Sequence, residues 1–118
     1  MRGYVPVEWP LLEELARTAA LPGPLAGWCV DPVWRSAASD VTEEEWEYEA
    51  LATAAEDLAP AGGAVLAIEA AVVPPAVVDG RFELPGTLVL ADVQAVFSQD
   101  LSWFGVQEIE DLLRTRPA

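Results

Sequence analysis

The chain has 118 residues, enough for one domain that buries roughly two-thirds of its unfolded surface. Hydrophobic residues make up 53% of it and include five tryptophans, a composition that excludes a disordered tail. Twenty Asp and Glu residues stand against six basic residues, all Arg, and the net charge of −14 disfavours direct binding to nucleic acid or to an anionic membrane surface. We predict a single domain over residues 1–118 whose partner, if it has one, is a basic protein.

The cysteine content and the longest apolar run bear on location. A single cysteine, Cys29, excludes an internal disulfide, which secreted domains of this size commonly have. The apolar run at residues 61–78 contains Glu69, Pro74 and Pro75 and cannot form a bilayer-spanning helix. These observations predict a cytoplasmic protein with no membrane segment.

The first predicted elements are a strand, a helix and a second strand. Residues 3–7 have strand character, and a helix begins at Pro10 because proline is favoured at the first helical position. This helix ends by residues 21–24, and residues 28–30 form the second strand. If the two strands lie parallel in one sheet, the unit is a right-handed crossover.

Two more helices are predicted from capping signals. Asp31 followed by Pro32 indicates the start of a short helix that runs to about residue 38. Thr42 and Glu45 form a capping box for a longer helix. Its predicted apolar stripe is Tyr48, Leu51, Ala55 and Leu58.

The C-terminal half is predicted to contribute most of the strands. Residues 64–73 read as a central strand that is apolar on both faces, and Asp79-Gly80 is a hairpin signal. Further strands are expected at residues 87–90, 93–98 and 101–104, before a last helix at 106–114. The predicted fold class is α+β: a mixed sheet of four or five strands, opened by the strand-helix-strand unit, with three or four helices.

The missing residue types restrict the chemistry. The sequence has no histidine and no lysine, so it lacks an imidazole base, a Schiff-base lysine and a P-loop. Cys29 lies between Trp28 and Val30 in a predicted strand, which is typical of a buried structural thiol. We therefore predict no catalytic residue and no cofactor.

Carboxylates remain as candidates. Glu69 interrupts an apolar strand, so it pairs with an arginine, reaches the rim of the sheet or holds a proton. Together with Asp92 and Glu108 it is a weak candidate for a Mg²⁺ or Ca²⁺ site, because the spacing matches no recognised loop. We predict no metal site.

The segment at residues 43–49 concentrates acidic and aromatic side chains on one helix. One interpretation is a solvated, capped helix with Tyr48, and with it Trp46, turned toward the core. The other is a docking surface for a basic partner, with an acidic and aromatic outer face. Its candidate partner-binding residues are Glu43, Glu44, Trp46, Glu47 and Tyr48.

Three stretches resemble a family of small actinobacterial proteins of unknown function. They are MRGYVP at residues 1–6 with PLL at 10–12, EEWEYEAL at 44–51, and WFGVQEI at 103–109 with DLL at 111–113; LADV at 90–93 is also similar. The chain departs from the family at Gly3, usually β-branched, and in the shorter segment between Asp100 and Trp103. The resemblance implies a single domain and the candidate site residues Tyr4, Glu47, Tyr48, Gln107 and Glu108.

Three functional hypotheses follow. The preferred one is a non-enzymatic interaction or regulatory protein that binds another protein through an acidic face. The second is a small carboxylate-based enzyme, metal-dependent if Glu69, Asp92 and Glu108 converge. The third is a nucleic-acid mimic that occupies the basic groove of a DNA- or RNA-binding protein.

Overall fold

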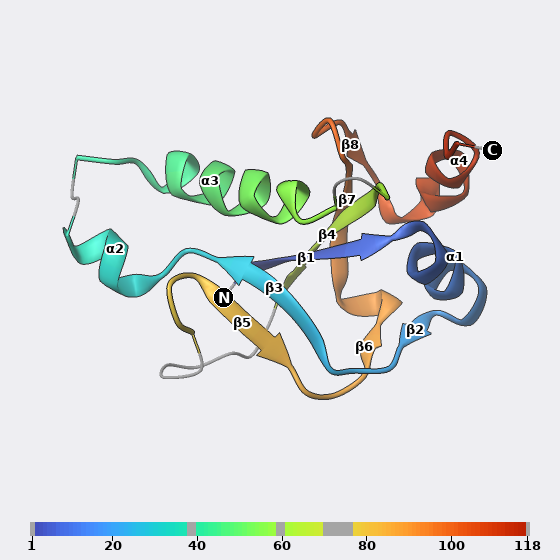
Figure 1. Ribbon diagram of the computed structural model, residues 1–118, viewed down its shortest axis with the longest axis horizontal. Coiled ribbons are helices and arrows are strands. Elements are labelled where there is room, and N and C mark those ends of the chain that lie inside the picture. Colours follow the sequence, from blue (N-terminus) through green and yellow to red (C-terminus); the bar gives the residue numbers. More distant parts are fainter. Residues whose placement is uncertain (1, 38–39, 59–60, 70–76, 118) are drawn as a thin grey trace.

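A six-stranded sheet with helices on both faces forms the centre of the protein (Figure 1). The computed structural model describes residues 2–37, 40–58, 61–69 and 77–117, without the side chains of 35–37. The sheet contains, in the spatial order β5-β3-β1-β4-β7-β8, strands β5 (Arg81–Leu84), β3 (Leu25–Cys29), β1 (Arg2–Glu8), β4 (Gly63–Glu69), β7 (Val93–Ser98) and β8 (Trp103–Phe104). Every pairing in it is antiparallel among the residues described.

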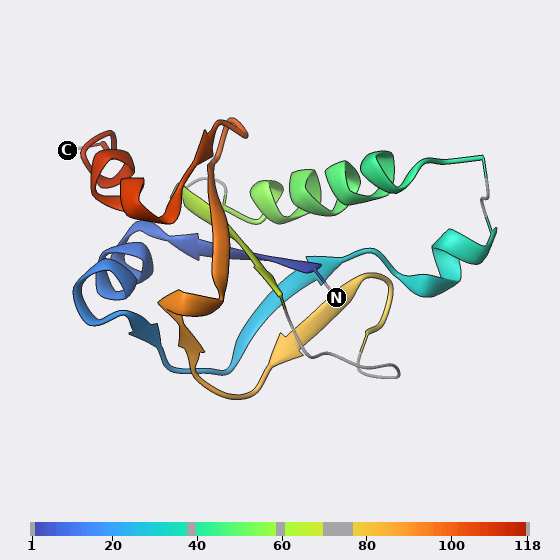
Figure 2. The ribbon, with the colours of Figure 1, turned by 180° about the vertical axis from the view of Figure 1, so that it is seen from behind.

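The remaining elements are four α-helices, two 3-10 turns and a small ribbon, counted over the described residues. The helices are α1 (Trp9–Thr18), α2 (Pro32–Ala37), α3 (Glu43–Glu56) and α4 (Ile109–Leu113), and the 3-10 turns are η1 (Leu90–Asp92) and η2 (Val106–Glu108). The ribbon pairs β2 (Ala20–Leu21) with β6 (Leu88–Val89). Seen from behind, it lies next to α1 at one end of the molecule (Figure 2).

Alternation along the strands divides the core between the two faces of the sheet. In β4, Leu66 and Ile68 point to the face covered by α1 and α4, whereas Val65 and Ala67 point to the face covered by α3. Because helices cover both faces, the strand is apolar on both sides, as a central strand should be. The prediction of a doubly buried central strand is confirmed for β4, and positions 70–73 of the predicted strand lie outside the described residues.

The predicted N-caps of α2 and α3 and the Asp79-Gly80 turn are confirmed, and of the predicted capping box the bond to the Thr42 side chain is present. The Thr42 side chain accepts a hydrogen bond from Glu45 N at 3.2 Å and caps α3. Asp31 Oδ1 accepts one from Val33 N at 2.8 Å and caps α2. The Asp79-Gly80 turn has positive φ angles of 52° and 82°, and Arg81 N donates to the Val78 carbonyl at 2.9 Å across it.

The α+β class is confirmed, and the sheet differs from the prediction in size and direction. It has six strands rather than four or five, and its described pairings are antiparallel rather than mixed. The opening strand-helix-strand unit is not a parallel crossover, since Gly3 lies opposite Cys29 in an antiparallel register. The reason is that α1 follows β1 without a loop and turns the chain at the end of the sheet, so β3 returns alongside β1.

The face covered by α3 positions the candidate site. Small residues on both sides of this contact, Ala54 on the helix and Ala67 and Ala95 on the strands, are buried and let the helix lie close to the sheet. Figure 1 shows α3 running beside the sheet from the α2 end, while α1 and α4 lie together at the opposite end. The far end of this face, where α2, β3 and the first half of α3 meet, is lined in part by core residues, Cys29 and Ala50 among them.

Candidate binding groove beside helix α3

A pocket of about 400 Å³ opens between α2, β3 and α3, and three tryptophans line it. We call it the tryptophan pocket; its lining residues are Trp28, Cys29, Trp34, Trp46, Glu49, Ala50 and Thr53. Each tryptophan comes from a different element, so the pocket exists only because the fold brings β3, α2 and α3 together.

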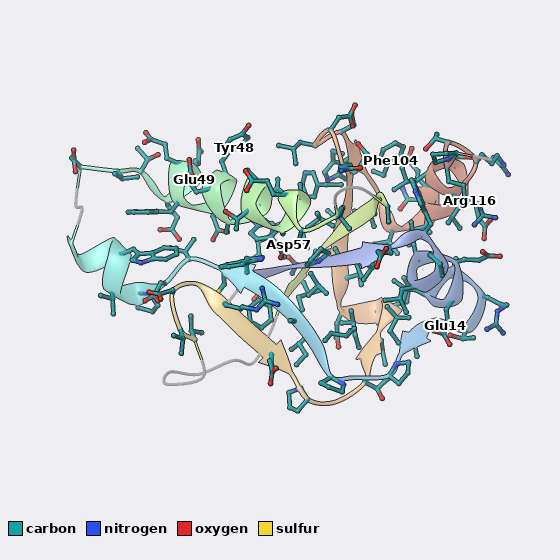
Figure 3. The ribbon with its side chains drawn as sticks, viewed as in Figure 1. Glu14, Tyr48, Glu49, Asp57, Phe104 and Arg116 are labelled. Carbon is teal, nitrogen blue, oxygen red and sulfur yellow. The ribbon has the colours of Figure 1, made fainter. Side chains whose placement is uncertain are left out.

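Trp28 is held in place by a carboxylate and a cation. Its Nε1 donates a hydrogen bond to Asp57 Oδ2 at 2.7 Å, and the Arg81 guanidinium carbon lies 5.2 Å from its ring centroid. Arg81 and Asp57 also form a salt bridge at 3.7 Å. Asp57 follows α3 and lies between this helix and the sheet in Figure 3, so these contacts tie β3, β5 and the end of α3 around one indole ring.

Trp34 and Trp46 stack on each other across the gap between α2 and α3. Their ring centroids lie 6.1 Å apart with an interplanar angle of 26°, an offset geometry that is favourable for aromatic pairs. Trp46 Nε1 is buried and has no hydrogen-bond partner among the residues described. Stacking and apolar packing, rather than a hydrogen bond, therefore hold the Trp46 ring in place.

The buried carboxylate of Asp31 sets the position of Trp34. Asp31 is 6% exposed, and its Oδ2 accepts a hydrogen bond from Gly80 N at 3.2 Å in addition to the α2 cap. The Asp31 carbonyl accepts one from Trp34 N at 3.0 Å. A Cβ at Gly80 would lie 2.7 Å from Trp34 Cη2, so the ring sits directly against this turn. Asp31 thus joins the start of α2 to the hairpin below Trp34.

A second, more acidic hollow of about 750 Å³ adjoins the tryptophan pocket. We call it the acidic hollow; its lining residues are Val41, Thr42, Glu44, Glu45, Trp46, Tyr48 and Glu49. The two spaces share Trp46 and Glu49, and together they form what we call the α3 groove. One end of this groove is aromatic and the other is lined by carboxylates.

The predicted inward orientation of Tyr48 is wrong, and Trp46 turns inward as the solvated-helix interpretation expects and not outward as the docking interpretation does. Tyr48 is 57% exposed and points away from the sheet (Figure 3), whereas Trp46 is half-buried against Trp34. Glu47 takes the inward position in this turn of α3 through its bond to Tyr4, and Tyr48, the next residue, is rotated about 100° around the helix axis from it. The buried stripe therefore runs through Ala50, Leu51, Ala54, Ala55 and Leu58.

Glu47 also faces inward rather than outward. Its Oε2 accepts a hydrogen bond from the hydroxyl of the buried Tyr4 at 2.8 Å. Burial, followed by the Glu47 carboxylate, raises the pKa of Tyr4, so the phenol stays neutral and serves as a donor. Of the predicted partner-binding residues, Glu43 and Glu44 are exposed in the first turn of α3, and Glu44 lines the acidic hollow.

The remaining candidates implied by the resemblance lie away from the α3 groove. Glu108 Oε1 accepts a hydrogen bond from Gly105 N at 2.9 Å and caps the turn that leads into α4. Gln107 is exposed on that turn, and the following Ile109 packs into the core on the other face of the sheet. The structure therefore joins Tyr4 to Glu47 but keeps Gln107 and Glu108 on the other side of the sheet.

The weak metal candidates do not form a site. Glu69 is exposed at the end of β4, opposite Arg2 in the strand register, while Asp92 belongs to η1 and Glu108 caps η2. Within residues 2–37, 40–58, 61–69 and 77–117, no three Asp, Glu or Cys side chains gather as a ligand set.

Cys29 is a structural thiol. It is 1% exposed, and burial, with a further contribution from Asp31, raises the pKa of its thiol. A raised pKa keeps the sulfur protonated and a weak nucleophile. The interpretation of Cys29 as a buried packing residue agrees with this environment.

Most residues of the α3 groove carry no local sequence signal. Trp28, Trp34 and Glu49 were not candidates, and neither were Asp57 and Arg81 behind them. The usable signal was compositional, since five tryptophans are many for a chain of this length. Their spacing follows no single periodicity because the pocket residues lie on three elements.

The fold and the groove define a single-domain α+β protein with a tryptophan-lined, acid-flanked groove on one face of an antiparallel sheet. The chain belongs to DUF6912, a family of unknown function, whose profile matches residues 1–100. This span includes the first two stretches of the sequence resemblance, and the third lies beyond it. No curated protein and no solved structure matches the chain. Among the described helices, none is long and apolar enough to cross a bilayer.

Proposed function

We propose that this protein is a non-enzymatic interaction protein that binds a basic protein partner through the α3 groove. The observation that carries the proposal is that an aromatic pocket and a carboxylate-lined hollow have two lining residues in common, Trp46 and Glu49. The proposal includes a cytoplasmic location, in agreement with the single unpaired cysteine, and an origin among actinobacterial relatives.

The two ends of the groove have complementary physical roles. The acidic hollow contributes the carboxylates of Glu44, Glu45 and Glu49 to a chain whose net charge is −14. This charge attracts a basic surface over long range and accelerates its association. The indole rings offer the large apolar contact that slows dissociation, since tryptophan is enriched among residues that dominate binding energies. Charge brings the partner to the groove, and the aromatic end retains it.

Charge reversal on α3 tests this proposal. A Glu44→Lys, Glu45→Lys, Glu49→Lys variant changes the charge of the groove, and a matched Glu83→Lys, Asp92→Lys, Glu110→Lys variant makes the same net change at exposed positions on β5, η1 and α4. Basic proteins captured by the wild-type protein are purified, and their direct binding is measured by surface plasmon resonance at several salt concentrations.

We expect the α3 variant to lose binding and the matched variant to retain most of it. Wild-type association should slow as salt rises, because screening weakens the long-range attraction. Equal loss in both variants would mean that net charge alone attracts the partner. Unchanged binding by the α3 variant, with circular dichroism confirming its fold, would refute the proposed groove.

A further inference from the structure

The polar groups around the tryptophan pocket are hydrogen-bond acceptors. The Thr53 hydroxyl donates its proton to the Glu49 carbonyl at 2.8 Å, so its oxygen is left as an acceptor. Glu49 contributes a carboxylate at the same rim. Two of the three indole donors are unavailable, because Trp28 Nε1 is bonded to Asp57 and Trp46 Nε1 is buried. A ligand that fits this pocket therefore supplies hydrogen-bond donors and requires few donors from the protein.

The protein already binds a guanidinium group on one of these rings. Arg81 lies over Trp28 with Asp57 as its counter-ion, yet Arg81 does not line the pocket and leaves it open. In the pocket, Trp28, Trp34 and Trp46 offer indole surface, and Glu49 can take the part that Asp57 plays for Arg81. The same combination of indole and carboxylate is thus present twice around Trp28, once occupied by Arg81 and once open.

We infer that the tryptophan pocket receives an arginine side chain of the protein partner, with Glu49 as its counter-ion and Thr53 as a second acceptor. This inference rests on the proposed function and specifies the residue that the groove selects. Arginine carries five donors and no acceptor, stacks on aromatic rings and is more weakly hydrated than lysine. The pocket volume of about 400 Å³ is within the usual range of sites that enclose a small group.

The neighbouring acidic hollow defines the context of that arginine. Glu44 and Glu45 lie next to the pocket through the shared Trp46 and Glu49. Basic residues that flank the inserted arginine would face these two carboxylates. The recognised element is accordingly an arginine within a basic segment of the partner.

Three peptides test the inference on the intact protein. The probe is acetyl-Lys-Lys-Gly-Arg-Gly-Lys-Lys-amide, compared with versions that carry lysine or the uncharged isostere citrulline in place of arginine. Titrations are followed by the indole N–H signals in ¹⁵N-correlated NMR spectra. We expect saturable shifts of the Trp28 and Trp34 signals with the arginine peptide, about tenfold weaker binding of the lysine peptide, and weaker binding still of the citrulline peptide.

Variants at the rim separate the pocket from overall charge. Thr53→Val preserves the shape of the side chain and removes the acceptor, and Glu49→Gln removes the counter-ion. Each variant should weaken the binding of the arginine peptide by more than the binding of the lysine peptide. Trp103→Phe is the control, because this ring is exposed on β8, outside the groove. Equal effects on the two peptides would contradict an arginine-selective pocket.

The outcomes distinguish this inference from the proposed function. Salt-dependent binding of all three peptides with equal affinity, and shifts limited to backbone amides near Glu44 and Glu45, would refute the arginine pocket and leave the proposed function standing. Binding of free arginine amide as tight as that of the peptide would show that the site serves a small cation rather than a protein. No binding of any peptide would also refute the inference, while the charge-reversal experiment decides the proposed function separately.

Discussion

Replacing Asp31 by alanine should destabilise the protein and loosen the tryptophan pocket together. Asp31 is the buried carboxylate that accepts hydrogen bonds from Val33 N and Gly80 N, and so joins α2 to the β5 hairpin. Alanine leaves both backbone donors without an acceptor. Trp34, which lies in the first turn of α2 and packs against Gly80, would lose the contacts that fix its position.

The magnitude follows from the two donors. Loss of a helix N-cap side chain costs about 1 kcal/mol, and a buried N–H left unsatisfied costs about 1–3 kcal/mol. We therefore expect Asp31→Ala to lower the free energy of unfolding by about 2–4 kcal/mol. Asp31→Asn retains one acceptor oxygen, so its effect should be smaller, about 1–2 kcal/mol. Removal of one negative charge from an acidic protein opposes this loss only slightly.

Urea denaturation followed by circular dichroism measures the effect. The unfolding midpoint of Asp31→Ala should fall by roughly 1–2 M urea, and the near-ultraviolet signal of the Trp34–Trp46 stack should weaken in the native state. Asp92→Ala is the matched control, because it removes the same charge from an exposed position in η1. If Asp31→Ala and Asp92→Ala differ by less than about 0.5 kcal/mol, the two hydrogen bonds do not stabilise the fold as argued.

Two further predictions concern buried titratable groups. The Cys29 thiol should react with a disulfide reagent no faster than the protein unfolds, since it is buried with a raised pKa; rapid labelling of native protein would contradict this. The raised pKa of Tyr4 means that the folded state keeps a proton that the unfolded chain releases near pH 10, so this stabilisation is complete below about pH 10 and is lost at higher pH. Tyr4→Phe leaves Glu47 without its donor, so in urea titrations it should be less stable than the wild type at pH 8. Between pH 10 and 11 it should lose less stability than the wild type, and parallel loss in the two proteins would refute the assignment.

Local signals in the sequence were sufficient for caps and turns. Asp31, Thr42 and the Asp79-Gly80 pair act on neighbours a few residues away, so the information needed to recognise them is contained in short windows. Sheet order is a different kind of information. Arg2 pairs with Glu69 and Glu8 with Gly63, and alternation of side chains indicates which face is buried but not which strand is the neighbour.

The orientation of α3 shows why site residues were harder to predict than helices. Tyr48 fits the apolar stripe by size and spacing, yet the buried face of α3 is made of Ala50, Leu51 and Ala54, and Glu47 takes the inward position because Tyr4 of β1 offers it a hydrogen bond. Trp46 turns inward because Trp34 of another helix provides a stacking surface. Both facts depend on tertiary contacts, and neither leaves a periodic trace in the segment itself.

The order of the sheet also limits how another chain could attach to it. The outermost strands are β5, with four residues, and β8, with two. On β5 the side chains of Arg81 and Glu83 are exposed on either side of the buried Phe82. Both edges are short and give an incoming strand few backbone groups to pair with, and on β5 the exposed charges further discourage aggregation through strand addition. The proposed interaction through the α3 groove accordingly uses side chains and does not extend the sheet.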